Sequence, residues 1–362
     1  MTRLFSVCCL LLLSASYLTA QKYSNEFLTI GVGARAHGMG HTQVAVVDDV
    51  TAGYWNPAGL TRHTRGLQVS AMHAEWFGGV GNYDYLALAT PINGGKQTVG
   101  ISAVRFGVDG IPNTLSLYDS DGTVNYDNIT EFSEADYAFL LSYAQPLKLG
   151  EERELHIGGN VKVIHRVIGK FADAWGFGID LGAQYRTGNW QFGLVARDLT
   201  NTFNAWNFTF TEEEKDQLAI TGNEIPINSV ELTRPQVALG AAYKSQFGKL
   251  GLLTAVDLVA TTDGQRNTLV SADPISLDPT VGVELDYNQR VFLRGGLYKA
   301  QRELDFDNQE YLTADPTLGV GIALRNLRID YAFSDVGDSD RQSYSHIVSL
   351  RITFEPKSNK QQ

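Results

Sequence analysis

Residues 175–185 read WGFGIDLGAQY, and their alternation decides the fold class. Odd-numbered positions carry aromatic or aliphatic side chains, whereas even-numbered positions carry Gly, Asp or Gln. Successive side chains of a β-strand point to opposite faces, so one face of this segment is apolar and the other is polar. With a rise of about 3.3 Å per residue and a tilt near 40°, the two end aromatics stand about 25 Å apart in height. That height matches the apolar band of a transmembrane β-barrel, with polar residues such as Gln184 facing a wet lumen.

The same alternation recurs along the chain as far as Phe354. We predict fourteen strands, at residues 67–76, 82–92, 96–108, 133–147, 153–167, 174–187, 190–199, 234–246, 249–261, 279–288, 290–300, 316–325, 327–336 and 344–355. Bacterial single-chain barrels have even strand numbers. The fold class predicted is therefore all-β, a transmembrane antiparallel β-barrel of about fourteen strands.

The connections between these strands are short at one end of the predicted barrel and long at the other. One end carries short turns rich in Gly and Asn, at 93–95, 149–151, 188–189, 247–248, 288–289 and 326. Gly and Asn adopt the positive φ that tight hairpins need. The other end carries long connections, at 109–132, 200–233, 262–278 and 301–315. Long loops lie outside the cell and short turns in the periplasm, and a soluble β-sandwich or propeller would not sort its loops in this way.

The remaining parts of the chain set its compartment and exclude some functions. Residues 1–20 read as a secretory signal peptide, with Arg3 before an apolar core, and residues 357–362 form a polar tail. The two cysteines, Cys8 and Cys9, lie within that signal, so the mature chain would have no disulfide. No other stretch approaches the length of a membrane helix. A net charge of −11 disfavours nucleic acid as a partner.

Residues 21–62 precede the predicted barrel, which spans 63–356, and they lack the strand rhythm. Residues 27–60 read FLTIGVGARAHGMGHTQVAVVDDVTAGYWNPAGL, with glycines that permit an irregular backbone. Irregular backbone at membrane depth is tolerated inside protein or along a wet cavity, so we predict an N-terminal plug in the lumen. Asp48 and Asp49 are expected partners for Arg35 or for lumen arginines, and Pro57 after Asn56 begins a short helical turn.

Other readings of this segment are weaker. Its glycine spacing misses the dinucleotide fingerprint. His37 and His41 stand four residues apart near two aspartates, which allows a metal site, but no predicted helix aligns them. We therefore predict packed polar residues, with no metal and no cofactor. The histidines are scattered outside any recognisable catalytic motif, so we predict that the protein is not an enzyme.

The same segment resembles the N-terminal motif of the PorV/PorQ family of Bacteroidota outer-membrane proteins, which is itself similar to the FadL-type transporters of hydrophobic compounds. The resemblance rests on residues 33–35 (GAR), 38–40 (GMG), 45–49 (AVVDD) and 56–60 (NPAGL). It implies a fourteen-stranded barrel with a plug in the outer membrane of a Gram-negative bacterium. The plug residues that it singles out are Gly33, Arg35, Gly38, Gly40, Asp48, Asp49, Asn56 and Pro57.

The resemblance implies two alternative functions. PorV-like and PorQ-like proteins belong to the type IX secretion system, so the first hypothesis is a secretion component that binds machinery proteins or cargo at loops 109–132 and 200–233. The alternative is a FadL-like transporter, which passes a hydrophobic small molecule through a plug and a lateral opening. Outer-membrane lipid and lipopolysaccharide surround the barrel in either case.

One loop could serve either function, because four of its residues are aromatic: Phe203, Trp206, Phe208 and Phe210. Such residues are enriched in protein-contact surfaces, and they could equally line an apolar ligand pocket. A third reading is that the loop folds over the barrel mouth and buries these rings itself.

Overall fold

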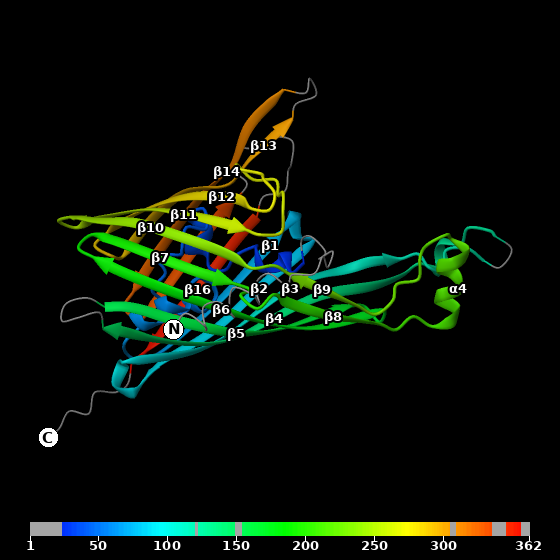
Figure 1. Ribbon diagram of the computed structural model, residues 1–362, viewed down its shortest axis with the longest axis horizontal. Coiled ribbons are helices and arrows are strands. Elements are labelled where there is room, and N and C mark those ends of the chain that lie inside the picture. The colour runs from blue at the N-terminus through cyan, green and yellow to red at the C-terminus, as the bar shows by residue number, and fades with distance from the viewer. Residues whose placement is uncertain (1–23, 120–121, 149–153, 305–308, 335–344, 356–362) are drawn as a thin grey trace, which may run out of the picture.

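A single antiparallel sheet closes on itself to form the molecule (Figure 1). The computed structural model describes residues 24–119, 122–148, 154–304, 309–334 and 345–355. The predicted signal peptide and polar tail lie outside this range. Strand β1 pairs with β16 from Leu67 opposite Phe354 to Glu75 opposite His346, and this pairing closes the ring. The predicted all-β barrel of fourteen wall strands is confirmed.

The wall strands follow one another around the ring. They are β1 (Leu67–Trp76), β2 (Gly81–Ile92), β3 (Gln97–Asn113), β4 (Thr130–Lys148), β5 (Glu154–Ile168), β6 (Ala172–Thr187), β7 (Trp190–Arg197), β10 (Gln236–Phe247), β11 (Leu250–Thr261), β12 (Ser276–Tyr287), β13 (Val291–Leu304), β14 (Glu310–Leu324), β15 (Leu327–Ser334) and β16 (Ser345–Phe354). Short 3₁₀ turns η3 (Phe77–Gly79), η4 (Asn93–Gly95) and η5 (Tyr126–Asn128) lie in the connections. β3, β4, β13 and β14 run several residues beyond their predicted ends, because their pairing continues above the barrel.

The segment 200–233, expected to be a single long connection, is instead structured. It contains β8 (Thr202–Phe208), the helix α4 (Glu212–Ile220) and β9 (Ser229–Thr233). β7 pairs with β6 only from Leu181 onward, so the upper part of β6 is left for β8, which pairs with residues 172–177. β9 then pairs with β8. β8 therefore pairs with the part of β6 that β7 leaves unpaired, and β9 adds one more strand beside β8.

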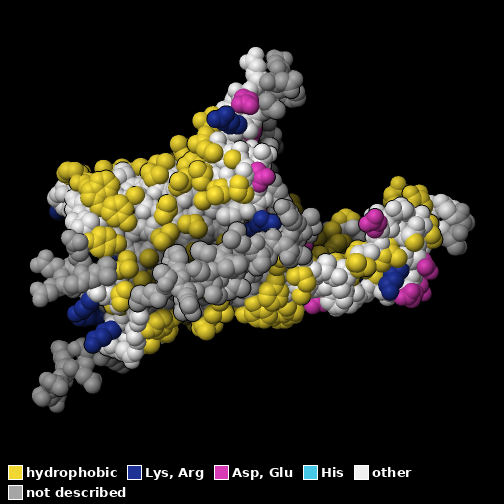
Figure 2. Space-filling view, viewed as in Figure 1, with side chains coloured by type: hydrophobic (Ala, Val, Ile, Leu, Met, Phe, Trp, Pro, Cys, Tyr) yellow, Lys and Arg dark blue, Asp and Glu magenta, His cyan; other side chains and the backbone are white. Residues whose placement is uncertain are grey.

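The two faces of the wall have the predicted polarity. Trp175, Phe177 and Leu181 on β6 point outward and are each 47–48% exposed, whereas Gly178 and Asp180 are buried on the lumen side. Figure 2 shows the resulting apolar belt over the barrel body. Arg105, which breaks this parity on β3, forms an outward ion pair with Asp84 at 3.3 Å. The register shift of β3 begins just above it, after Val108.

The lumen is filled rather than wet at the level of Gln184. This side chain is 1% exposed and donates to the carbonyl oxygens of Val44, at 3.3 Å, and Val47, at 3.1 Å. The expectation that Gln184 faces water is therefore wrong, because the N-terminal segment occupies the space that water would fill.

That segment enters the barrel as four short helices. They are η1 (Glu26–Leu28), α2 (Ala34–Gly38), α3 (Ala52–Trp55) and η2 (Pro57–Arg62). They lie inside the ring of strands, seen in blue in Figure 1. Across the described residues, no helix has the length and apolar character needed to cross a membrane.

Strand β6 offers a depth test of the outward face. We expect Leu181→Arg to lower the free energy of unfolding in lipid vesicles by about 2–4 kcal/mol, because it places a charge near the bilayer midplane. Thr187→Arg lies on the same face beside the turn at Gly188, so its cost should be about 0–1 kcal/mol. Urea titration of the two variants measures the difference, and equal stabilities would contradict the assignment of this face to lipid.

Candidate functional site

The plug packs directly against the backbone of the wall. Gly33 begins α2 with φ +87°, a conformation that favours glycine. At Gly40, with φ +57°, an added Cβ would lie 2.7 Å from the Leu297 nitrogen on β13. At Gly38 it would lie 2.9 Å from the Gly319 Cα on β14. The glycine pattern that stands out in the sequence thus marks where two backbones touch.

Arg35 ties α2 to β12. Its Nε and Nη2 atoms donate to the two carboxylate oxygens of Glu284 at 3.0 and 3.1 Å. Glu284 also accepts from Arg294 Nε at 2.7 Å and lies 3.5 Å from Arg328. Arg294 in turn pairs with Asp330 at 2.9 Å, and its side chain is 0% exposed. A carboxylate among three guanidinium groups is therefore the centre of the plug's attachment.

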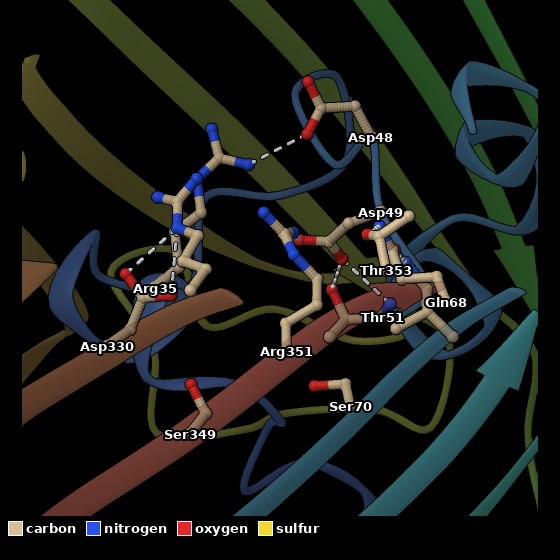
Figure 3. A network of polar contacts seen from close by, with 12 residues as sticks. Arg35, Asp48, Asp49, Thr51, Gln68, Ser70, Asp330, Ser349, Arg351 and Thr353 are labelled. Carbon is tan, nitrogen blue, oxygen red and sulfur yellow. Dashed lines mark hydrogen bonds and ion pairs between the residues drawn. The ribbon is translucent and has the colours of Figure 1, made fainter. Parts of the chain in front are cut away.

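The two neighbouring aspartates have different roles (Figure 3). Asp49 pairs with Arg351 on β16 and accepts the Thr51 N–H at 2.9 Å, so it fixes the plug to the wall. Asp48 lies 3.3 Å from Arg35 and 3.9 Å from Arg186, but its side chain is 44% exposed. The expected pairing of both aspartates with Arg35 or lumen arginines is present, with Asp48 as the weaker contact.

Asn56 joins the plug to β6. Its Nδ2 donates to the carbonyl oxygens of Val44, at 2.7 Å, and Ala183, at 3.1 Å. Its Oδ1 caps η2 by accepting the Ala58 N–H at 3.2 Å, with Pro57 as the first residue of that turn. The absence of a side chain at Gly182 leaves the space in which the amide sits.

Asp257 was missed by the sequence analysis. It lies on β11 and accepts the backbone N–H groups of Gln43 at 2.7 Å and Val44 at 2.9 Å. The sequence offered one indication: Asp257 is the only acidic residue of the mostly apolar segment 250–261, at a position that faces the lumen. Its partners are backbone groups, which no sequence pattern specifies.

The opposite side of the plug is apolar. Tyr54 and Trp55 of α3 belong to one buried cluster with wall side chains, mostly from β1–β5. The wall members are Met72, Ala74, Trp76, Tyr83, Tyr85, Ala87, Ala89, Val104, Ala138, Leu140, Ala144, Ile164, Ala332 and Ile347. The plug is thus held by ions toward β12–β16 and mainly by apolar contact toward β1–β5, where Asn160 on β5 also donates to the Gly53 carbonyl oxygen at 2.6 Å. We call the second contact the apolar seam.

His37 and His41 contact each other within the plug. Their ring nitrogens lie 3.0 Å apart, and His37 Nε2 is 3.1 Å from the Gly31 carbonyl oxygen. The rings of Trp55 and Trp76 pack around them. Among the residues that the structure describes, no three possible metal ligands gather in one place.

The four aromatic residues of loop 200–233 do not form one surface. Phe203 points outward against Phe177, with ring centroids 5.9 Å apart. Trp206 points inward and is covered by Arg166, 5.1 Å from its centroid. Phe208 and Phe210 continue a stack from Trp206 with spacings of 6.0 and 6.3 Å. Three of the four rings thus stack on one face, and Phe203 lies on the other because side chains alternate along β8. A role of this loop in binding stays a prediction.

Two cavities lie at the rim beside the N-terminal end of the plug. The larger, about 170 Å³, is lined by polar residues that include Arg234, Asp263 and Arg266. Burial raises the pKa of Asp263, but hydrogen bonds and attraction from Arg266 outweigh it and hold that pKa below its ordinary value. The smaller, about 30 Å³, touches Lys162 and Asp198. Neither has the apolar lining of a hydrophobic ligand site.

Solved structures share this architecture. The Ralstonia pickettii toluene transporter TbuX is 15% identical, with a TM-score of 0.55 over 90% of this chain and 99% of that chain. The P. putida toluene transporter TodX is 14% identical, with a TM-score of 0.56 over 90% and 99%. A Pseudomonas aeruginosa FadL homologue is 14% identical, with a TM-score of 0.51 over 90% and 98%.

The fold is that of a FadL-type barrel with a plug. At these identities the likeness shows the fold alone. No protein-family model matches the chain, and no curated protein matches it. The resemblance of residues 33–60 to the PorV/PorQ motif therefore stays a prediction.

The ion network predicts unequal effects of two conservative changes. Glu284→Gln removes one partner from a buried set of arginines, so we expect it to destabilise the protein by about 3–5 kcal/mol. Asp48→Asn removes a partly exposed contact and should cost about 0–1 kcal/mol. Urea unfolding gives the stability, and protease cleavage within residues 27–60 reports release of the plug. Equal cleavage of the two variants would contradict the central role of Glu284.

Proposed function

We propose that the protein is a non-enzymatic channel of a Gram-negative outer membrane that passes small hydrophobic compounds. The fold shared with toluene transporters and a FadL homologue supports this proposal. So does the predicted signal peptide at residues 1–20. The observation that carries it is the two-sided attachment of the plug, which is ionic toward β12–β16 and mainly apolar toward β1–β5, with few hydrogen bonds such as that from Asn160 to the Gly53 carbonyl oxygen.

The apolar seam favours a hydrophobic solute over water. Separating Tyr54 from its wall partner Tyr85 exposes apolar surface, at a cost of about 25 cal/mol per Å² in water. A hydrophobic molecule that enters the seam covers this surface and restores the lost contacts, whereas water or an ion does not. Displacement of the plug is thus favourable only when a hydrophobic solute enters at the same time and covers the exposed apolar surface. Neither of the two cavities beside the plug is an apolar cavity of ligand size, so we propose that the solute enters by displacing the plug.

The ionic side keeps the plug attached during that displacement. Breaking the bonds between Arg35 and Glu284 would leave the buried Arg35 guanidinium with only the partly exposed Asp48 as a countercharge, which is more costly than parting apolar surfaces. We therefore propose that α3 moves away from β1–β5 while α2 stays fixed. The ion network then acts as the hinge of a gate whose opening edge is the apolar seam.

The pairing of β6 is interrupted between residues 177 and 181, where its partner changes from β8 to β7. β7 ends at Arg197, and β8 begins at Thr202 after two residues with positive φ, Asp198 and Asn201. Across this interruption a backbone bond runs from Leu199 N–H to the Ile179 carbonyl at 2.9 Å. We propose that a hydrophobic solute leaves sideways into the membrane at this point.

A disulfide across the seam tests the gate. A Cβ built at Gly53 lies 3.9 Å from the Ser142 Cβ on β4, within the range that a disulfide spans. We expect oxidised Gly53→Cys/Ser142→Cys to lose most toluene uptake in cells that lack other hydrocarbon channels. Reduction should restore uptake, because it frees α3.

The matched controls are the two single cysteine variants, which should transport normally under both conditions. The mature chain has no other cysteine if residues 1–20 are removed, so the background is clean. Undiminished uptake through the fully oxidised variant would refute movement at the seam. Absence of uptake by the wild-type protein would refute the channel.

A secretion role is the second candidate, since the PorV/PorQ resemblance implies it. One observation favours it, namely a structured projection outside the barrel that presents apolar side chains to solvent. A strain lacking the protein that still displays type IX cargo on its surface would exclude this role.

A further inference from the structure

A projection extends from one side of the barrel mouth, and we call it the arm. It comprises residues 109–119, 122–136, 164–174 and 202–230. Upper parts of β4, β5, β6 and β8 form its stem, and α4 lies toward its far end (Figure 1). The arm is therefore built on strands continuous with the barrel wall and stands away from the membrane.

Helix α4 lacks the packing that ordinarily stabilises a helix. None of its nine residues is buried. Its supports are a capping box between Thr211 and Glu214 and an ion pair from Lys170 to Glu214 at 2.7 Å. The hydrogen bond from Lys170 holds the pKa of Glu214 below its ordinary value. An isolated helix of nine residues is only marginally stable in water. The described residues do not bury any residue of α4, so its exposed face is open to a partner.

Apolar side chains on the arm are also uncovered. Ile220 and Ile227 are each 78% exposed, and Tyr126 is 75% exposed. Other exposed apolar residues of the arm are Tyr118, Val124, Phe203, Ile225 and Val230. They lie among acidic residues, since Asp and Glu outnumber Lys and Arg by twelve to three in the arm. Figure 2 shows the apolar and acidic groups side by side near the end of the arm.

The stem of the arm also ends on an open strand edge. In the described residues β9 pairs with β8 on one side and with no strand on the other. An unpaired edge can accept an extended segment of another chain. The arm thus combines a helix without packing, uncovered apolar groups and a free strand edge.

We propose that the arm is a docking surface for a cell-surface or secreted protein that presents an apolar patch ringed by Lys and Arg. The negative charge of the arm favours a basic protein over the other possible partners. The acidic arm repels the anionic lipopolysaccharide leaflet, and two copies of the arm repel each other, whereas a basic protein is attracted. The apolar groups supply the contact core and the carboxylates form its rim. The proposal stands whether the barrel carries hydrophobic compounds or serves secretion.

Site-specific photo-crosslinking identifies the partner in living cells. A photoreactive residue at Ile227 of the full chain should join one discrete protein with a basic surface. The same residue at Leu312 should not, although Leu312 is 64% exposed on the separate projection formed by β13 and β14. Adducts with lipopolysaccharide, with a second copy of this chain, with an acidic protein, or no adduct at all would overturn the proposal.

Binding of the purified partner to the full chain in lipid nanodiscs then tests the contact. We expect Ile220→Ser/Ile227→Ser to raise Kd at least tenfold. Asp127→Lys/Glu224→Lys should also raise Kd at least tenfold and should remove most of the salt dependence. The matched control, Leu312→Ser, should leave Kd unchanged. Unchanged affinity in both arm variants would overturn the proposal.

Two further readouts separate docking from folding and transport. Amide exchange in α4 should slow when the purified partner is bound, because the helix gains the packing that it lacks alone. Toluene uptake should be unaffected in both arm variants. Failure of the channel proposal would therefore appear in uptake, and failure of the docking proposal would appear in crosslinking and Kd.

Discussion

The carboxylate of Glu284 is the interaction on which the plugged barrel depends. Three guanidinium groups converge on it, one from the plug and two from the wall, and none of them could be buried at this depth without a countercharge. The same contact fixes α2 against β12–β15 and so places the rest of the plug. With α2 fixed, Asn56 reaches β6, Asp49 reaches β16, and α3 meets the aromatic lining of β1–β5.

Charged contacts therefore dominate one side of the lumen, and apolar contacts dominate the other. Charged contacts are strong at short range and costly to leave unpaired, so they hold one geometry. Apolar contacts are non-directional, and a ligand of similar character can replace them. In the proposed gate, a plug held mainly by ions on one side and mainly by apolar contact on the other is both anchored and displaceable. Neither a wholly ionic nor a wholly apolar lumen would combine these properties.

Period-two alternation was enough to predict the wall from sequence, because it depends on the surroundings of each face and not on distant partners. It assigned Trp175 outward and Asp180 inward. It failed at Gln184, because the contents of the lumen come from another part of the chain. It also failed at Asp257, whose partners are amide groups, and at Phe203 and Trp206, because seven residues in a long connection did not stand out as a strand. Which arginine meets Glu284 depends on the path of the plug, and that path is invisible to a periodicity argument.

The position of the plug also bears on how the ring closes. β1 and β16 are separated by most of the chain, and bringing the ends of so long a loop together carries an entropic cost. The plug precedes β1 directly and holds β12–β16 through α2 and Asp49. Once it has bound the late strands, β16 is already beside β1, and the final pairing joins neighbours. The segment that fills the finished lumen therefore also links the first wall strand to the last ones.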